Sequence, residues 1–352
     1  MSEAENILAA PLQHPRRRWA WIAPLVMLLA VLGLLALQQN LILARSIKPL
    51  GPWPVPPPHS ATVDLGVTTL PLARNPWRLW QPSDLVSVNR FEHAVHLHAS
   101  VVMWYADWRA APPALAQLNA VALRGSVPEI TWEPWDATGK LFEAQPRYAL
   151  RNLVAGRFDA YVRMWARRLA AWGKPVRLRF AQEMNGNWYP WGRSINGNRP
   201  GQFVAAWRRV HRIFNQAGAR NVSWVWSPVT GAPKAFFPGR REVDMLGVTC
   251  LNGGTKLFQM RWRSFSLICG RSIHALHRLA PGLPIELSEV ASASVGGSKS
   301  AWIRAMFAYL ARHHEVKSVI WFELRKEADW SVEDSPSATL ALRAGVGSGR
   351  FR

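Results

Sequence analysis

The stretch that decides the fold runs from Arg179 to Trp191 and reads RFAQEMNGNWYPW. Its first residues complete an apolar run, and Glu183 is followed directly by amide and indole side chains. A second stretch, Pro284 to Ser292, reads PIELSEVAS and carries Glu289 after another apolar run. Aromatic faces stack on the C–H surfaces of sugars, and paired carboxylates exchange protons and form the covalent bond in glycoside cleavage. The two stretches therefore predict a sugar site with two carboxylates at the ends of two strands.

Short β-like runs alternate with helical stretches from Val63 onward. The helical patterns at Phe158–Trp172 and Pro200–Ala217 are long enough to cross back over a parallel sheet. About eight such units predict an α/β fold of the (β/α)8 TIM-barrel type. A doubly wound open sheet is the alternative, although no glycine-rich nucleotide motif follows the first strand. The expected strands are Val63–Val67, Ser100–Trp104, Val127–Trp132, Val176–Phe180, Val222–Trp226, Met245–Val248, Ile285–Ser288 and Ser318–Trp321.

In such a barrel the carboxyl ends of the strands form the active face, and the notable side chains gather at the predicted strand ends. We expect Glu183 and Glu289 to be catalytic, because each lies at a strand end and sugar-binding residue types surround the first. Glu286, on the same predicted strand as Glu289, is interpreted as a structural residue or a decoy. The predicted substrate-binding residues are Arg179, Gln182, Asn185, Trp188, Trp191, Trp104, Glu133, Trp226 and Trp321.

An uncharged apolar run, Trp19–Leu37, is close to the ~20 residues that cross a bilayer. Arg16–Arg18 precede it and favour a cytoplasmic N-terminus. A cleaved signal peptide is the alternative, although the apolar run is too long for one. The proline-rich segment that follows predicts a semi-rigid spacer. We expect five parts: a cytoplasmic N-terminus at 1–18, a signal anchor at 19–37, a linker at 38–62, the barrel at 63–345 and a tail at 346–352. The anchor would lie in a bacterial inner membrane, with the barrel in the periplasm or outside the cell.

The composition narrows the classes of partner. A formal net charge of +21 favours contact with anionic lipid headgroups or an acidic polysaccharide. Nucleic acid is not favoured, since no compact basic stripe is interleaved with aromatic residues. The 20 Trp residues exceed what an average domain needs and favour a carbohydrate-facing surface.

Two groups of residues could form a disulfide or a metal site. Cys250 and Cys269 could form a disulfide in an oxidising compartment or could be two small core residues. His93, His96 and His98 invite a metal interpretation, but no matched carboxylate follows them, so packing and surface roles are favoured. The sequence implies no metal and no organic cofactor.

The motifs of this chain resemble those of glycoside hydrolase family 26, the endo-β-mannanase family of the large retaining (β/α)8 clan. The resemblance implies that Glu183 is the general acid/base and Glu289 the nucleophile. It also implies that Arg179, Asn185, Trp188 and Trp321 line the cleft around the cleaved bond. The motifs are Ile130–Trp135, Arg179–Trp191, Trp224–Pro228, Phe237–Gly239 with Val243-Asp244, Pro284–Ser292, Trp321-Phe322 and Asp329-Trp330.

The chain departs from the family pattern at two places. Gln182 stands where the family usually has His directly before the acid/base. Thr249-Cys250-Leu251 stands where the family usually shows Asp-x-Tyr near the nucleophile. Both carboxylates remain while their neighbours differ, so we expect weak activity on plain β-1,4-mannan and better activity on another β-linked glucan or an exopolysaccharide.

Together these observations predict a membrane-anchored retaining endo-β-glycosidase with a monomeric catalytic domain. Its substrate would be a β-linked polysaccharide such as mannan, β-glucan or an exopolysaccharide. The alternative is a catalytically impaired polysaccharide-binding or exopolysaccharide-assembly protein on a hydrolase-like barrel.

Overall fold

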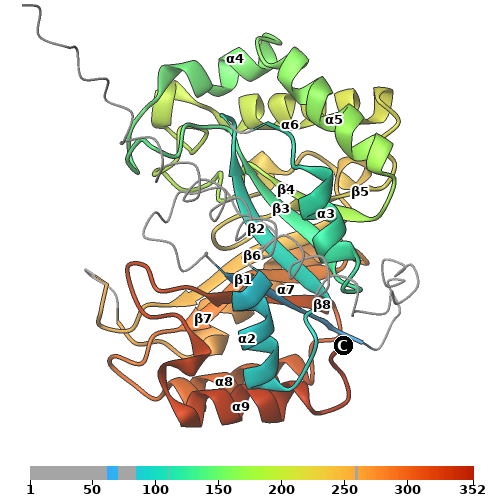
Figure 1. Cartoon of the computed structure of the whole chain (residues 1–352). Helices are drawn as coiled ribbons and strands as arrows, with labels where there is room; N and C mark the ends of the chain where they lie inside the picture. The colour runs from blue at the N-terminus through green and yellow to red at the C-terminus, as the bar shows by residue number, and fades with distance from the viewer. Residues whose placement is uncertain (1–61, 70–84, 110, 258–260) are drawn as a thin grey trace, which may run out of the picture. The chain divides into compact units, whose positions relative to one another are not determined.

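Eight parallel strands close into a barrel with helices on its outside (Figure 1). The computed structural model describes residues 62–69, 85–109, 111–257 and 261–352. The strands are β1 (Asp64–Thr69), β2 (Val101–Asp107), β3 (Val127–Glu133), β4 (Val176–Phe180), β5 (Val222–Trp226), β6 (Met245–Asn252), β7 (Ile285–Ser292) and β8 (Val316–Glu323). The helices are α2 (Leu85–Val95), α3 (Leu115–Ala122), α4 (Leu150–Val154), α5 (Asp159–Trp172), α6 (Pro200–Gln216), α7 (Arg271–Leu279), α8 (Lys299–Leu310) and α9 (Pro336–Val346).

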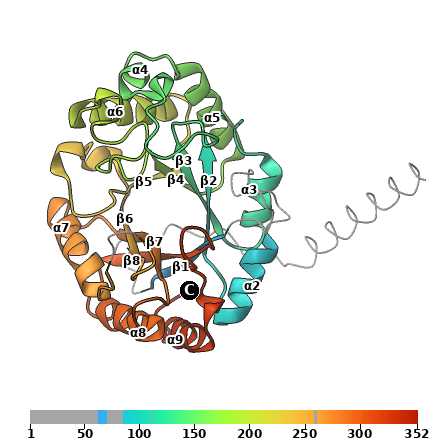
Figure 2. The ribbon, with the colours of Figure 1, turned by 90° about the vertical axis from the view of Figure 1, so that its left-hand side faces the viewer.

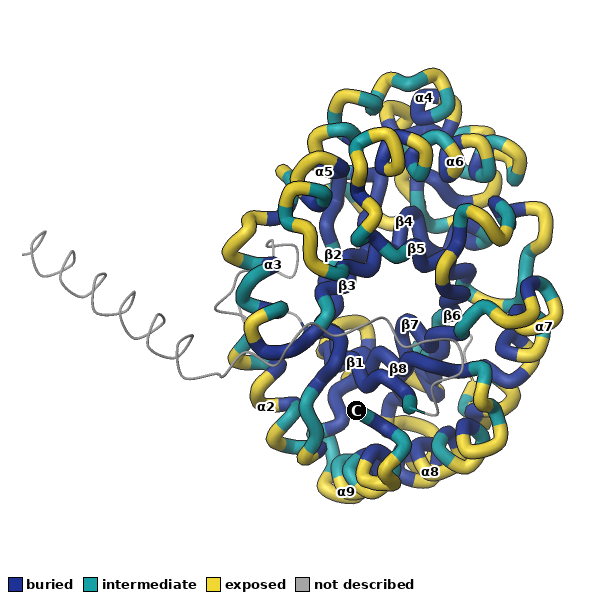
Figure 3. Tube along the Cα trace, turned by 90° about the vertical axis from the view of Figure 1, so that its right-hand side faces the viewer, coloured by how far each residue is buried: buried dark blue, intermediate teal, exposed yellow. Residues whose placement is uncertain are grey.

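The predicted barrel is therefore confirmed and the open sheet is excluded, because β1 pairs with β8 as well as with β2. Viewed along the barrel axis, the strands form a ring inside the ring of helices (Figure 2). The strands are buried almost throughout, while the helices alternate between buried and exposed residues (Figure 3). Helix α6 buries Phe203, Trp207, Val210 and Phe214 on one face, which is the spacing of an amphipathic helix. The two predicted helical ranges agree with α5 and α6 to within one residue at each end.

The chain end returns to the start of the barrel. Phe351 forms a parallel bridge with Val63, and the Arg352 guanidinium pairs with Asp64 at 2.9 Å. The last two residues, Phe351 and Arg352, thus pack against the start of the barrel.

Strand β7 is irregular where the second glutamate lies. Its Leu287 and Glu289 pair with Val248 and Thr249 of β6, so Ser288 is an extra residue. A side chain on Gly247 would meet the Ser288 hydroxyl at 2.4 Å, so the close approach of β6 to this irregularity requires glycine. Strict alternation puts residues 286 and 289 on opposite faces of a strand, and the extra residue lets both enter the barrel.

A layer of charged side chains fills the barrel interior around Arg177 on β4. Its guanidinium bonds Asp64 of β1 at 2.6 Å, Glu286 of β7 at 3.0 Å and the Ser318 hydroxyl of β8 at 3.0 Å. Glu129 of β3 lies 3.9 Å from the same guanidinium. Burial raises the pKa of Glu129 well above its ordinary value, and the Glu286 charge raises it further.

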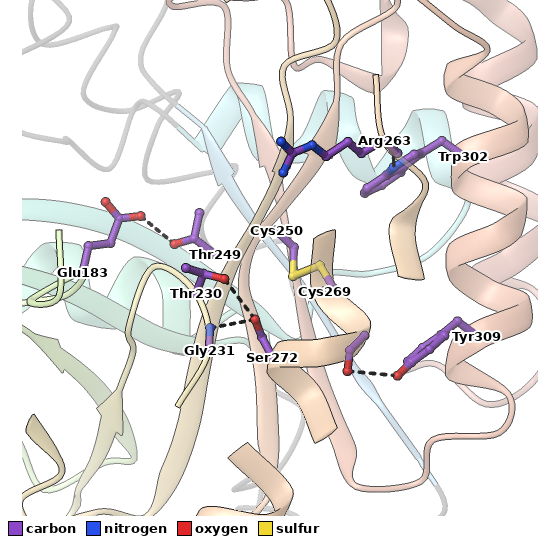
Figure 4. Close-up of a disulfide and its surroundings, with 11 residues drawn as sticks. Glu183, Thr230, Gly231, Thr249, Cys250, Arg263, Cys269, Ser272, Trp302 and Tyr309 are labelled. Carbon is purple, nitrogen blue, oxygen red and sulfur yellow. Dashed lines mark hydrogen bonds between the residues drawn. A yellow bond between two sulfur atoms is a disulfide. The ribbon is translucent and has the colours of Figure 1, made fainter. Parts of the chain in front are cut away.

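Cys250 of β6 and Cys269 form a disulfide, which is the first of the two possibilities that the sequence left open (Figure 4). The sulfur atoms are 2.01 Å apart and both residues are fully buried. The disulfide joins β6 to the helical turn before α7. Its Cys250 directly follows Thr249 in the sequence.

The predicted membrane span Trp19–Leu37 and most of the linker lie outside the described residues. Within the part of the chain that the structure describes, no helix is both long enough and apolar enough to cross a bilayer.

Candidate active site

The first glutamate sits in a tight turn after β4. Glu183 has φ 55° and Ala181 φ 46°, both in the left-handed region that residues with side chains seldom occupy. The Glu183 amide donates to the Ser227 carbonyl beyond β5 at 2.7 Å and fixes this turn. Such backbone strain is commonly retained where a side chain must be aimed at a reaction.

Two neutral donors hold the Glu183 carboxyl. The Thr249 hydroxyl donates to Oε1 at 2.7 Å (Figure 4), and the Trp188 indole N–H donates to Oε2 at 2.9 Å. Burial raises the pKa of Glu183 and the Glu289 charge raises it further, while Arg179 and these two hydrogen bonds oppose the shift. A carboxyl with a raised pKa keeps its proton closer to neutral pH, which suits a general acid.

The second glutamate is held by a charge. Arg179 is fully buried, and its Nη1 lies 2.5 Å from Glu289 Oε1. Its Nη2 donates to the Thr249 hydroxyl at 3.4 Å. An ion pair favours the ionised form of a carboxylate. Glu183, Thr249, Arg179 and Glu289 therefore form one connected group that brings the two predicted catalytic residues together.

A third carboxyl lies at the end of β3. Glu133 accepts a hydrogen bond from Gln182 Nε2 at 2.5 Å and another from the Trp135 indole at 3.2 Å. Burial raises the pKa of Glu133 to about 7 against the effect of these two bonds and of Lys326. Gln182, which stands where the family usually has His, thus holds a neighbouring carboxyl.

The predicted aromatic residues occupy two kinds of place. Trp188 is half-buried beside Glu183. The Trp191 and Trp226 indoles donate to the Gln182 and Phe236 carbonyls, and both are fully buried. Trp104 and Trp321 are also buried. A substrate contact by these four indoles stays a prediction.

The side-chain amide of Asn185 forms hydrogen bonds with two backbone groups of the loop after β5. Its Oδ1 accepts from the Val229 amide at 2.9 Å, and its Nδ2 donates to the Thr230 carbonyl at 3.1 Å. The side chain joins the turn after β4 to the loop after β5. Its predicted role at the substrate stays a prediction.

Sequence reasoning missed three residues of this group. It noted Thr249 as a departure from the family pattern but gave it no part in holding Glu183. Tyr105 and Tyr189 are half-buried, and burial raises the pKa of both phenols, helped by the charges of Glu289 on Tyr105 and of Glu133 on Tyr189. The place of Tyr105 two residues before the end of β2 could have indicated it.

Among the described residues, no three His, Cys, Asp or Glu side chains are grouped as a metal site. His98 instead lies 3.0 Å from Glu92 and contacts the Ser126 hydroxyl.

The sequence comparisons identify the family of this barrel. The model for glycosyl hydrolase family 26 matches residues 129–257, which include Glu133, Glu183 and Thr249. Endoglucanase H of Acetivibrio thermocellus is 33% identical over 258 residues, covering 70% of this chain and 27% of that protein. This chain belongs to glycosyl hydrolase family 26.

Other relatives are shorter matches. The mannan endo-1,4-beta-mannosidase of Bacillus subtilis is 28% identical over 83 residues, 22% of this chain and 23% of that protein. This family 26 chain thus spans about a quarter of the length of these curated relatives. The GH26 β-mannanase of Bacteroides ovatus has the same fold, with a TM-score of 0.63 at 13% identity, over 84% of this chain and 91% of that one.

Proposed function

We propose that the barrel hydrolyses a β-linked polysaccharide by double displacement. The Glu289 carboxylate attacks the anomeric carbon, the bond to the leaving oxygen breaks, and Glu183 gives that oxygen its proton. Water then attacks the same carbon, Glu183 takes the proton, and the bond to Glu289 breaks. The observation that carries the proposal is the difference between the two carboxylates, since Glu289 pairs with Arg179 while Glu183 has a raised pKa on neutral donors.

The substrate we favour is a β-glucan or a related exopolysaccharide rather than plain β-1,4-mannan. The relative with the longest match is named an endoglucanase, and the mannosidases match over a much shorter range. Thr249 places a neutral hydroxyl between the two glutamates, where the family usually has an Asp. A site with one fewer carboxylate should accept a different hydroxyl pattern at the cleaved sugar.

We further propose that the barrel works outside the cytoplasm on the anchor at 19–37. The Cys250–Cys269 disulfide supports this location, because disulfides persist in oxidising compartments. Protease added to spheroplasts should degrade the barrel. Full protection in intact spheroplasts would reverse the topology.

Reducing-end release from a panel of β-glucans and mannans tests the activity. Glu183→Gln and Glu289→Gln should each lower the rate by roughly 10³-fold or more, because each removes a group that takes part in bond breaking. The matched control is Glu315→Gln, which removes a carboxylate before β8 at the other end of the barrel. This variant should keep the wild-type rate. If wild type cleaves no β-glycan while Glu183→Gln binds one normally, the non-catalytic alternative holds.

A further inference from the structure

The segment of the chain that carries Glu183 is rich in basic residues. Between Tyr148 and Pro233 the sequence has fourteen Arg and Lys residues but only two acidic ones, Asp159 and Glu183. Asp159 pairs with Arg209 at 2.6 Å, and Glu183 belongs to the site. The positive charge of this segment is thus nearly uncompensated within it.

Five cations lie on the segments between β3 and α5 and between β4 and α6, which we call the basic lip. All five are exposed, and the loops leave the barrel at the same end as Glu133 and Glu183. None of the five forms an ion pair with another residue that the structure describes. The basic lip consists of Lys140, Arg147, Arg151, Arg193 and Arg199.

Hydrogen bonds join the two loops of the lip to each other and to the site. The Arg151 guanidinium donates to the Asn196 carbonyl at 2.8 Å, and the Asn196 amide donates to the Ala144 carbonyl. The Phe142 amide donates to the Trp188 carbonyl at 2.8 Å, and the Trp188 indole holds Glu183. The lip is therefore continuous with the catalytic group.

A hollow of about 860 Å³ lies within the first loop of the lip. Leu141, Phe142 and Tyr148 line it together with Lys140 and two carboxylates. Asp136 pairs with Arg109 at 2.9 Å, and Glu143 accepts a hydrogen bond from the Lys140 amide at 2.9 Å. Phe142 is 66% exposed and has φ 69°, an unusual conformation for a bulky residue. An aromatic ring held open to solvent beside a cleft suits stacking on a sugar.

We propose that the substrate is an acidic β-glycan, whose carboxylate-bearing sugars bind along the basic lip while one ring stacks on Phe142. This inference rests on the proposed function, because it identifies the class of polysaccharide that the same site receives. A rim with net positive charge raises the local concentration of an anionic substrate, and salt weakens this attraction. An acidic polysaccharide fits better than a membrane, because hydrogen bonds join the lip to the Glu183 group and the lip includes a hollow with an exposed aromatic ring.

Two polymers with one backbone test the proposal on the full-length protein: carboxymethyl β-1,4-glucan, which is acidic, and hydroxyethyl β-1,4-glucan, which is neutral. Binding is measured by affinity electrophoresis, so the result does not depend on cleavage. Wild type should bind the acidic polymer at least about tenfold more tightly at low salt, and this advantage should shrink as ionic strength rises past roughly 0.1 M.

Charge reversal separates the lip from the general basic surface. Arg151→Glu/Arg193→Glu/Arg199→Glu should abolish the preference for the acidic polymer. Arg167→Glu/Arg168→Glu/Arg220→Glu is the matched control, since these three exposed arginines lie at the opposite end of the barrel, and it should keep the preference. The double variant Arg193→Glu/Arg199→Glu retains the Arg151–Asn196 bond and should lose most of the preference if the triple variant fails to fold. Phe142→Ala should weaken binding of both polymers to the same degree.

Equal loss in the lip and control variants, or no preference in wild type, would overturn the inference. Binding to phosphatidylglycerol vesicles that depends on the lip as strongly as glycan binding does would make it a membrane surface instead, and would also overturn it. Hydrolysis of the neutral polymer without a preference leaves the proposed function standing and refutes the lip. A lip-dependent preference without hydrolysis of any glycan supports the lip and refutes the proposed function.

Discussion

Two layers of charged side chains fill the barrel, one around Arg177 and one around Arg179, two residues apart on β4. In the Arg177 layer the guanidinium bonds Asp64 and Glu286 directly, and Glu129 lies buried beside them. In the Arg179 layer the guanidinium holds Glu289, while Glu183 rests on neutral donors. The same residue types thus give a closed structural network in one layer and a pair of unlike carboxylates in the other.

This difference shows that neither the residue type nor the strand is enough to predict the role of a buried carboxylate. Glu286 and Glu289 lie three residues apart on β7 and both enter the barrel because Ser288 is extra. What separates them is the partner: Glu286 shares its arginine with Asp64 and accepts a further bond from Ser288 at 2.8 Å. Glu289 faces Glu183 through Arg179 and Thr249.

The largest expected effect on stability comes from the Arg177 layer. Arg177→Met removes the one cation shared by Asp64 and Glu286 and leaves the buried Glu286 charge without a cation, which costs about 3–5 kcal/mol of unfolding free energy. Urea unfolding measures it, with the exposed Arg168→Met as a control expected within about 0.5 kcal/mol of wild type. A loss below about 1 kcal/mol would mean that the layer is not the network described.

A second effect concerns Glu133 at the mouth. Its folded-state pKa of about 7 lies above the ordinary value of 4.5, so the folded state binds the proton more tightly than the unfolded state does. The stability from this group is present below pH ~4.5 and is lost as pH rises to about 7, by about 3 kcal/mol at 1.36 kcal/mol per unit. Glu133→Gln lacks this loss, so its unfolding free energy should fall less than that of wild type across the window. Parallel curves for the two proteins would contradict the raised pKa.

The smallest effect is at Thr249, which links the two glutamates. Thr249→Val removes the hydroxyl that lowers the pKa of Glu183, so that pKa should rise further. Because Glu183 must be protonated to act as the acid, the alkaline limb of the kcat/KM profile should move to higher pH. Thr249→Ser keeps the hydroxyl and should leave the limb in place. A shift toward lower pH would show that another group sets this limb.

The sequence predicted where all eight strands lie, because fully buried strands read as short apolar runs bounded by turns. The strands β6 and β7 run four residues further than expected, to Asn252 and Ser292, so Glu289 lies within β7 rather than after it. It did not predict the irregularity of β7, since the pattern IELSEVAS contains nothing that fixes where the extra residue falls. It therefore could not show that both Glu286 and Glu289 enter the barrel. Nor could it tell Trp188 from Trp226, because an indole beside a strand end suits a cleft and a core equally, and the hydrogen bond to the Phe236 carbonyl forms only after folding.

The most direct test of the central claim is to trap the covalent intermediate. A 2-fluoro β-glycoside with a dinitrophenolate leaving group, built on the sugar that wild type hydrolyses best, should label the protein once. Peptide mapping by mass spectrometry should find the sugar on Glu289 and none on Glu286. A label on Glu286 or Glu183, or release of the leaving group with an inverted product and no label, would contradict the account.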